Sequence, residues 1–270
     1  MPDPSATLPA SAAPDVAEFR LLGVRVHAVT VSELHRLIGR AVRRRERFLM
    51  VSQNLHSVYV VHRDEELRFA QALATCVRID GMPIVLLGRL LGLPLRRVHR
   101  TGWMDWLEPF MSEAVERSWR IHYVGSKPGV AERGAVTLRK RFPGLSITTD
   151  HGYFPIEPGH DAFEAVIERI RSTSPDVLIV GMGMPRQEQF VVRAFDRHEV
   201  PVILTAGACM DYVAGVISVP PRWLGRIGLE WAYRLVSEPT RLWRRYLVEP
   251  WFALGLFARD LAERRFGGRR

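Results

Sequence analysis

Four polar side chains in this sequence could do chemistry together, because each follows the end of a short apolar run. They are Ser52, Asn54, Asp80 and Gln187. If the runs before Ser52 and Asp80 are parallel neighbours of the strand at 176–180, their carboxyl ends share an edge and the four side chains converge there. A lone carboxylate beside a hydroxyl and an amide suits a general base that takes a proton from an alcohol, with neighbours that orient a sugar. An Asp before a Gly is also typical of an ordinary turn, so that alternative stays open.

The stretch 176–190, DVLIVGMGMPRQEQF, joins one of these runs to a helix start. The β-branched run Val177 to Val180 predicts a buried parallel strand, and Pro185 is typical of a first helical turn. Open α/β sheets place ligands at such a strand end. An ordinary strand-to-helix turn is the alternative, because Gly181-Met182-Gly183 does not complete a GxGxxG motif.

Motifs for other chemistries are missing from the sequence. The nine His are scattered, with no HExxH, no Cys/His cluster and no Asp-x-Asp pair, so no metal site is predicted. No GxSxG supports a serine nucleophile. The segment 125–129, GSKPG, resembles a phosphate loop only loosely and lacks P-loop spacing, which favours an ordinary turn.

The C-terminal segment is both basic and aromatic. The net charge is +9, and residues 222–270 contain 11 Arg against five acidic residues, together with four of the seven Trp. Such a segment indicates an anionic partner: phosphate, nucleic acid or a membrane surface.

Three arginines in this segment, Arg234, Arg241 and Arg244, are spaced seven and then three residues apart. If they face one side, their guanidinium groups would bind a diphosphate well, because each offers paired donors and a permanent charge. A solvated basic face or a lipid-headgroup contact is the alternative. The apolar stretch Trp251 to Phe257 is an amphipathic candidate for contact with a membrane surface.

Strand and helix character alternate from about residue 20 to 218, which predicts a Rossmann-like, mostly parallel sheet with helices on both faces. Strands are expected near 21–29, 48–52, 76–79, 120–124, 145–149, 176–180 and 200–205. Helices are expected near 31–45, 55–73, 82–92, 103–117, 128–141, 161–172 and 185–197. After Gly215 the alternation ends, and two or three helices separated by Pro239 and Pro250 are expected.

Composition divides the chain into three parts: a disordered leader (1–17), an α/β core (18–218) and a basic helical appendage (219–270). The leader is rich in Ala, Pro and Ser and lacks the basic start and apolar centre of a signal peptide. No apolar run reaches the roughly 18 residues that span a bilayer. Cys76 and Cys209 are expected to be buried thiols in a reducing compartment rather than a disulfide.

Several stretches, in this order and spacing, resemble the WecG/TagA/CpsF family of bacterial glycosyltransferases (glycosyltransferase family 26, GT-E fold). The similarity runs from about residue 20 to 250. The stretches that carry it are SQN at 52–54, IDGMP at 79–83, VGSKPGVAE at 124–132, HGYF at 151–154, PDVLIVGMGMPRQE at 175–188, AGACMDYVAG at 206–215 and GLEWAYRLVSEPTRLWRRYL at 228–247.

The resemblance implies an inverting, metal-independent enzyme without a cofactor. It would transfer N-acetylmannosamine or a related hexose from a UDP-sugar to a polyprenyl-diphosphate-linked sugar acceptor, in cell-surface polysaccharide or exopolysaccharide biosynthesis. The expected location is cytoplasmic, peripheral on the inner face of the cytoplasmic membrane. Apolar helices without obvious partners also make a homo-oligomer an expectation.

The same resemblance implies roles for individual residues. Asp80 would be the general base on the acceptor hydroxyl, and Ser52, where the family usually has Thr, would line the sugar pocket with Asn54. Gln187 matches the family's pocket glutamine, and Arg100 corresponds to the arginine after the DG loop, two residues later than usual. The residues that would clamp the UDP diphosphate are Arg234, Arg241 and Arg244.

Two other classes of protein are weighed against this interpretation. An NAD-dependent oxidoreductase would need a complete GxGxxG and an acidic residue about 20 positions further on. A basic nucleic-acid-binding α/β protein would use the Arg- and Trp-rich appendage, and its binding would depend steeply on salt. No nucleic-acid partner is expected, because no RNA-binding motif is visible in the sequence.

Overall fold

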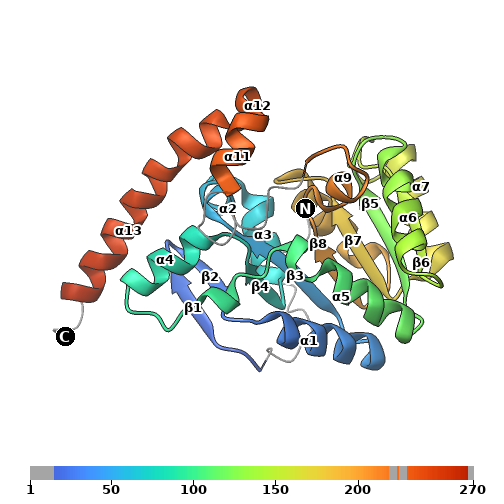
Figure 1. Ribbon diagram of the computed structural model, residues 1–270, viewed down its shortest axis with the longest axis horizontal. Coiled ribbons are helices and arrows are strands. Elements are labelled where there is room, and N and C mark those ends of the chain that lie inside the picture. The colour runs from blue at the N-terminus through green and yellow to red at the C-terminus, as the bar shows by residue number, and fades with distance from the viewer. Residues whose placement is uncertain (1–14, 219–223, 225–229, 267–270) are drawn as a thin grey trace.

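The computed structural model describes residues 15–218, 224 and 230–266, and most of it is organised around one eight-stranded sheet (Figure 1). The strand order is β1-β2-β4-β3-β8-β7-β5-β6; β1 and β2 pair antiparallel, and the other pairings are parallel. The predicted Rossmann-like α/β class is confirmed. The strands are β1 (Glu18–Leu21), β2 (Val24–His27), β3 (Phe48–Gln53), β4 (Cys76–Ile79), β5 (Arg120–Gly125), β6 (Ser146–Asp150), β7 (Val177–Gly181) and β8 (Val202–Thr205).

Helices cover both faces of this sheet, and two apolar cores lie between them and the strands. One face packs against α1 (Val31–Arg44), α5 (Trp103–Glu116), α6 (Val130–Arg141) and α9 (Cys209–Val213). The other packs against α7 (Asp161–Thr173), α8 (Arg186–Ala194) and the end of α3 (Glu65–Leu73). The central strands are buried on both faces, which explains why they read as continuous apolar runs. Cys76 and Cys209 are buried and unpaired.

A third apolar core joins the β1–β2 hairpin to α2 (Leu55–Val61) and α4 (Met82–Leu90). The sequence predicted one strand over 21–29, and the structure instead turns at Leu22 (φ 53°) and Gly23 (φ 71°). A Cβ at Gly23 would lie 2.7 Å from His62 Nε2, so this turn requires glycine. The hairpin was missed because Leu-Gly is not one of the dipeptides that signal a tight turn.

Two other expectations from the sequence differ from the fold. The predicted helix 55–73 is two helices, because the Asp64 side chain accepts a hydrogen bond from the Leu67 N–H (2.8 Å) and caps a new one. The sequence placed the strands before Ser52 and Asp80, which are β3 and β4, next to β7. In the structure β8 lies between β3 and β7, so neither β3 nor β4 is a neighbour of β7. The carboxyl ends of these parallel strands still meet at one edge.

The C-terminal helices form an appendage at one end of the sheet (Figure 1). They are α11 (Glu230–Ser237), α12 (Pro239–Trp243), a π-helical turn (Arg244–Val248) and α13 (Glu249–Phe266). The break at Pro239 is as predicted, whereas the break expected at Pro250 is absent: helical backbone continues from Pro239 to Phe266, with only the π-helical turn before Glu249 to interrupt its regularity. Leu256 and Phe257 of α13 pack against the third core, and Asp260 Oδ2 accepts a hydrogen bond from the Leu22 N–H (2.5 Å). Most of the predicted leader (1–17) lies outside the described residues.

Candidate active site

Asp80 lies at the carboxyl edge of the sheet, directly after β4, and is held there by two neighbours. Its N–H donates to the Gln53 carbonyl (2.9 Å), and its Oδ1 accepts a hydrogen bond from Arg78 Nη1 (3.1 Å). Residues two apart on a strand share a face, so Arg78 stands beside the carboxyl it contacts. The Arg78 side chain is 1% exposed, whereas that of Asp80 is 34% exposed. The Asp80 carboxyl is thus accessible to solvent, and the arginine that contacts it is buried.

The charge state of Asp80 follows from a balance between burial and arginines. Burial opposes ionisation, but the charges of Arg78, Arg100 and Arg245 outweigh it, and they hold the pKa of the Asp80 carboxyl below its usual value. At neutral pH the group is therefore a carboxylate that can accept a proton. Arg245 was not among the residues that the sequence predicted.

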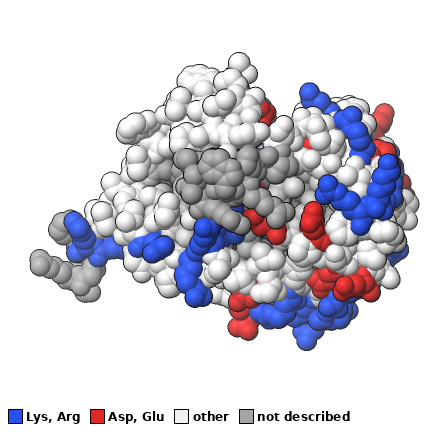
Figure 2. All heavy atoms as spheres, in the orientation of Figure 1, with Lys and Arg blue, Asp and Glu red and all other residues white. Residues whose placement is uncertain are grey.

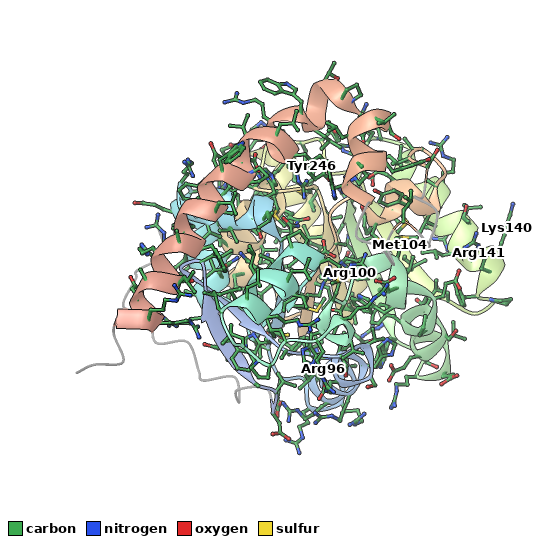
Figure 3. The ribbon with its side chains drawn as sticks, turned by 60° about the vertical axis from the view of Figure 1, so that its left-hand side comes forward. Arg96, Arg100, Met104, Lys140, Arg141 and Tyr246 are labelled. Carbon is green, nitrogen blue, oxygen red and sulfur yellow. The ribbon has the colours of Figure 1, made fainter. Side chains whose placement is uncertain are left out.

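Arg100 reaches Asp80 from the loop before α5. This loop pairs with the end of β4: the Thr101 N–H donates to the Ile79 carbonyl (2.8 Å). Arg100 Nη1 donates to Asp105 Oδ2 (2.9 Å), and a Cβ on Gly102 would lie 3.7 Å from Asp80 Oδ1. A Cβ at that distance would make an ordinary van der Waals contact, so the loop packs directly beside the carboxyl. In Figure 3, Arg100 lies near the centre of the view, below the helices of the appendage.

Ser52 and Asn54 lie beside the Asp80 loop, as their spacing predicted. Ser52 is buried at the end of β3, and its register partner on β4 is Arg78. Asn54 caps α2: its Oδ1 accepts a hydrogen bond from the Ser57 N–H (3.1 Å). A Cβ on Gly81 would lie 3.2 Å from the Asn54 Cβ, so the two loops are in contact.

Gln187 differs in its surroundings, because it is 1% exposed and both ends of its amide are engaged. Its Oε1 accepts a hydrogen bond from the Gly207 N–H (2.9 Å), and its Nε2 donates to Glu188 Oε1 (2.7 Å). The side chain therefore ties the start of α8 to the loop after β8. The Gln187 side chain is thus enclosed, whereas the Asp80 carboxyl is partly exposed to solvent.

Glu188 is a buried acid at the start of α8, where the sequence predicted no more than a polar first turn. Its side chain is 2% exposed, and its Oε2 makes no hydrogen bond with the described residues. Burial first, and then the negative charge of Asp64, raise the pKa of the Glu188 carboxyl to about 8, against the hydrogen bond from Gln187. Glu188 is thus a neutral carboxylic acid at pH 7. Its position one residue after a buried Gln gave no sign of this.

The three predicted arginines of the appendage occupy different surroundings. Arg234 is partly buried; burial disfavours its charge, but Tyr212, Tyr246, Glu238 and Asp80 together raise its pKa. Arg244 is exposed, and its guanidinium lies 6.0 Å from the Trp243 ring centroid. The third, at position 241, belongs to α12, but its side chain lies outside the described part of the chain.

Arg245 shares the inward face of the appendage, whereas its neighbour Arg244 does not. It lies three residues after the buried Leu242 and four before the buried Glu249. These spacings put the three side chains on one side of a helix. The charge of Arg245 acts on Asp80 and Arg234, so the appendage brings cations to the sheet rim. The spacing of the buried residues was the signal in the sequence that could have revealed Arg245.

Comparison with known proteins decides the family. A sequence model described as "Glycosyl transferase WecG/TagA/CpsF family" matches residues 19–266, which include the sheet, its rim and the appendage. The chain belongs to the WecG/TagA/CpsF family. The resemblance carried by the SQN, IDGMP and GLEWAYRL stretches is thereby confirmed.

Curated relatives from three strains of Staphylococcus aureus (MW2, NCTC 8325 / PS 47 and MRSA252) carry one name, N-acetylglucosaminyldiphosphoundecaprenol N-acetyl-beta-D-mannosaminyltransferase. Each is 27% identical to this WecG/TagA/CpsF protein over 171 residues. The match covers 63% of this chain and 65% of each relative, so the chain matches less than two thirds of their length.

Metal ligands and membrane spans do not accompany this WecG/TagA/CpsF site in the part of the chain that the structure describes. Among those residues, no three His, Cys, Asp or Glu side chains gather as a metal site would require. Within the same ranges, no helix combines the length and apolar character needed to cross a membrane.

Proposed function

We propose that this chain is an inverting glycosyltransferase that moves a hexose from a UDP-sugar to a polyprenyl-diphosphate-linked sugar. One observation carries the proposal: in a chain of this family, an ionised, partly exposed carboxylate stands at the sheet edge among Arg78, Arg100 and Arg245. The carboxylate can accept a proton, and the positive charges of the arginines favour binding of a diphosphate.

The reaction is a single displacement. Asp80 takes the proton of the acceptor hydroxyl as that oxygen attacks the anomeric carbon, and the bond from that carbon to UDP breaks. The diphosphate carries negative charge before and after that bond breaks, and Arg234, Arg241 and Arg245 hold it throughout, whereas the exposed Arg244 adds a weaker attraction. No step requires a metal ion or a cofactor.

Ser52, Asn54 and Arg100 surround the base and are proposed to orient the sugars. Gln187 acts through the Gly207 loop that it holds, because both ends of its amide are already engaged. Its proposed contribution is to fix the position of the Gly207 loop, which forms part of the pocket.

The names of the relatives support the choice of substrates. They specify an N-acetylmannosaminyl group and an undecaprenyl-diphosphate-linked N-acetylglucosamine acceptor. We propose N-acetylmannosamine or a related hexose as the transferred sugar here, with an acceptor of the same class, in the biosynthesis of a cell-surface polysaccharide.

Such an acceptor lies in a membrane, and the appendage offers a surface for it. Trp251 is 73% exposed, and Leu254 on the same helix is also exposed. In Figure 2 the surface over α12 and the adjoining part of α13 shows few charged side chains. Peripheral contact with the inner face of the cytoplasmic membrane is therefore proposed. Within the described part of the appendage, the other exposed large apolar residues are Trp231, Val236, Trp243, Leu247 and Val248.

The experiment that tests this function is a screen of UDP-sugars for release of UDP, with and without a polyprenyl-diphosphate-GlcNAc analogue. Acceptor-dependent release with UDP-N-acetylmannosamine or a related UDP-hexose is expected, and it should persist in EDTA. Salt-dependent binding of RNA or DNA without any release of UDP would favour the nucleic-acid-binding alternative.

A further inference from the structure

The start of α13 is fastened to the first turn of α2 by a side-chain hydrogen bond. His56 Nδ1 donates to Glu249 Oε2 (2.7 Å), and the Glu249 side chain is 10% exposed. His56 lies two residues after Asn54, and Glu249 lies four residues after Arg245. The contact therefore joins the helix that begins at the sheet rim to the turn that carries the inward-facing arginine.

Aromatic packing surrounds the same contact. The Phe252 ring meets Tyr59 edge-on (centroids 5.6 Å apart) and His62 in the same manner (5.3 Å). The Arg63 guanidinium lies 4.3 Å from the Phe252 ring centroid. Because Phe252 is one turn from Glu249, the two side chains present one face of α13 to α2. The start of the helix thus has a defined orientation against α2.

The turn before this contact is π-helical, which makes its register sensitive to how the start of α13 is held. The Glu249 N–H donates to the Arg244 carbonyl, five residues earlier, over the turn Arg244–Val248. π-helical turns are rare, and they change which side chains face inward relative to a regular helix. A shift of this turn by one residue would change which of Arg244 and Arg245 faces the sheet rim, and the contact at Glu249 opposes such a shift.

We propose that Glu249 and His56 form a positioning pair that holds Arg245 toward Asp80 and the diphosphate of the donor. This role rests on the proposed function. The far end of α13 has its own attachment through Asp260 and the apolar contacts of Leu256 and Phe257. Loss of the pair should therefore loosen the π-helical turn without detaching the helix.

Steady-state kinetics with the UDP-sugar donor test this role. Glu249→Ala should raise the donor KM about tenfold while kcat changes less than about threefold, because the pair acts on binding of the leaving group. Glu249→Gln, which keeps an oxygen for His56, should recover most of the loss. Glu263→Ala is the matched control: Glu263 is exposed on the same helix, paired with Arg259 (3.6 Å), and its removal should change neither constant.

A double-mutant cycle shows whether the pair acts through Arg245. In an Arg245→Ala background, Glu249→Ala should have no further effect on the donor KM. Additive losses would overturn the positioning role, and so would a donor KM in Glu249→Ala equal to that of the wild type. If Glu249→Ala does not fold, His56→Gln takes its place in the cycle, with the same outcomes.

UDP titration of the wild type separates the two levels of the proposal. A wild-type chain that binds no UDP overturns the proposed function, and the positioning role falls with it. A wild type that binds UDP, beside a Glu249→Ala variant of equal affinity, overturns the positioning role alone.

Discussion

The sheet rim and the appendage hold their charged groups by different means. At the rim, Asp80 is attached through its own N–H to the neighbouring strand, and it rests on Arg78, which is buried inside β4. In the appendage, Arg245 depends on a short π-helical turn and on side-chain contacts around Glu249. The sheet fixes the proposed proton acceptor, whereas contacts between helices fix the cations of the appendage.

This difference leads to a division of labour. Substitutions at the rim should change the chemical step and its pH dependence. Substitutions in the appendage should change the affinity for the UDP part of the donor. Variants in the two regions can break this separation or make it sharper.

The largest effect is expected for Asp80→Asn. General-base catalysis contributes roughly 10²–10⁴-fold, so kcat should fall by about that factor while the variant stays folded. Acceptor-dependent UDP release measures it. Turnover within about threefold of the wild type would remove Asp80 from its role.

The next effect concerns two adjacent arginines with different surroundings. Arg245→Ala should raise the donor KM about tenfold, because its charge reaches the rim. Arg244→Ala removes an equal charge from an exposed position beside Trp243, and it should raise the donor KM less than about threefold. Equal losses in both variants would mean that the π-helical turn does not select between them.

A smaller effect is expected on pH dependence when Arg78 loses its charge. Arg78 lowers the pKa of Asp80, so the wild type keeps its base ionised until the pH falls below that lowered pKa. In Arg78→Met the pKa of Asp80 rises, so the acid limb of kcat should move to higher pH. Far-UV circular dichroism checks the fold. If Arg78→Met is folded and its acid limb lies at the same pH as that of the wild type, Arg78 does not lower the pKa of Asp80.

Glu188 provides the smallest expected change in activity and a clear change in stability. Its folded pKa of about 8 exceeds the ordinary 4.5, so the folded protein keeps a proton that the unfolded chain releases between these values. Stability is therefore lost as pH rises through that window, at about 1.4 kcal/mol per unit. Glu188→Gln removes the ionisation.

Urea unfolding at several pH values measures this effect. Between pH 5 and pH 8, the unfolding free energy of the wild type should fall by on the order of 3 kcal/mol relative to that of Glu188→Gln. Parallel curves for the two proteins would show that Glu188 does not titrate in this window.

Much of the fold followed from the sequence, because buried parallel strands and amphipathic helices leave distinct patterns. The alternation predicted β3 to β8 and most of the helices on the two faces. The order of the strands did not follow, since nothing local in 200–205 says that β8 lies between β3 and β7. The β1–β2 hairpin also escaped, because Leu22 adopts a backbone conformation that its type rarely takes.

The candidate site was predictable where it depends on strand ends, and less so where it depends on packing. Ser52, Asn54 and Asp80 meet because parallel strands end at one edge. Arg78 had a usable signal, an arginine inside an apolar strand two residues before an aspartate. Arg245 required knowing which face of the appendage turns inward, and that depends on a contact between segments nearly 200 residues apart.

The most direct test of the division of labour is a calorimetric titration of UDP into the wild type, Asp80→Asn and Arg245→Ala. Asp80→Asn should bind UDP within about twofold of the wild type, whereas Arg245→Ala should bind it about tenfold more weakly. Lost affinity in Asp80→Asn together with full affinity in Arg245→Ala would contradict the assignment of proton transfer to the rim and diphosphate binding to the appendage.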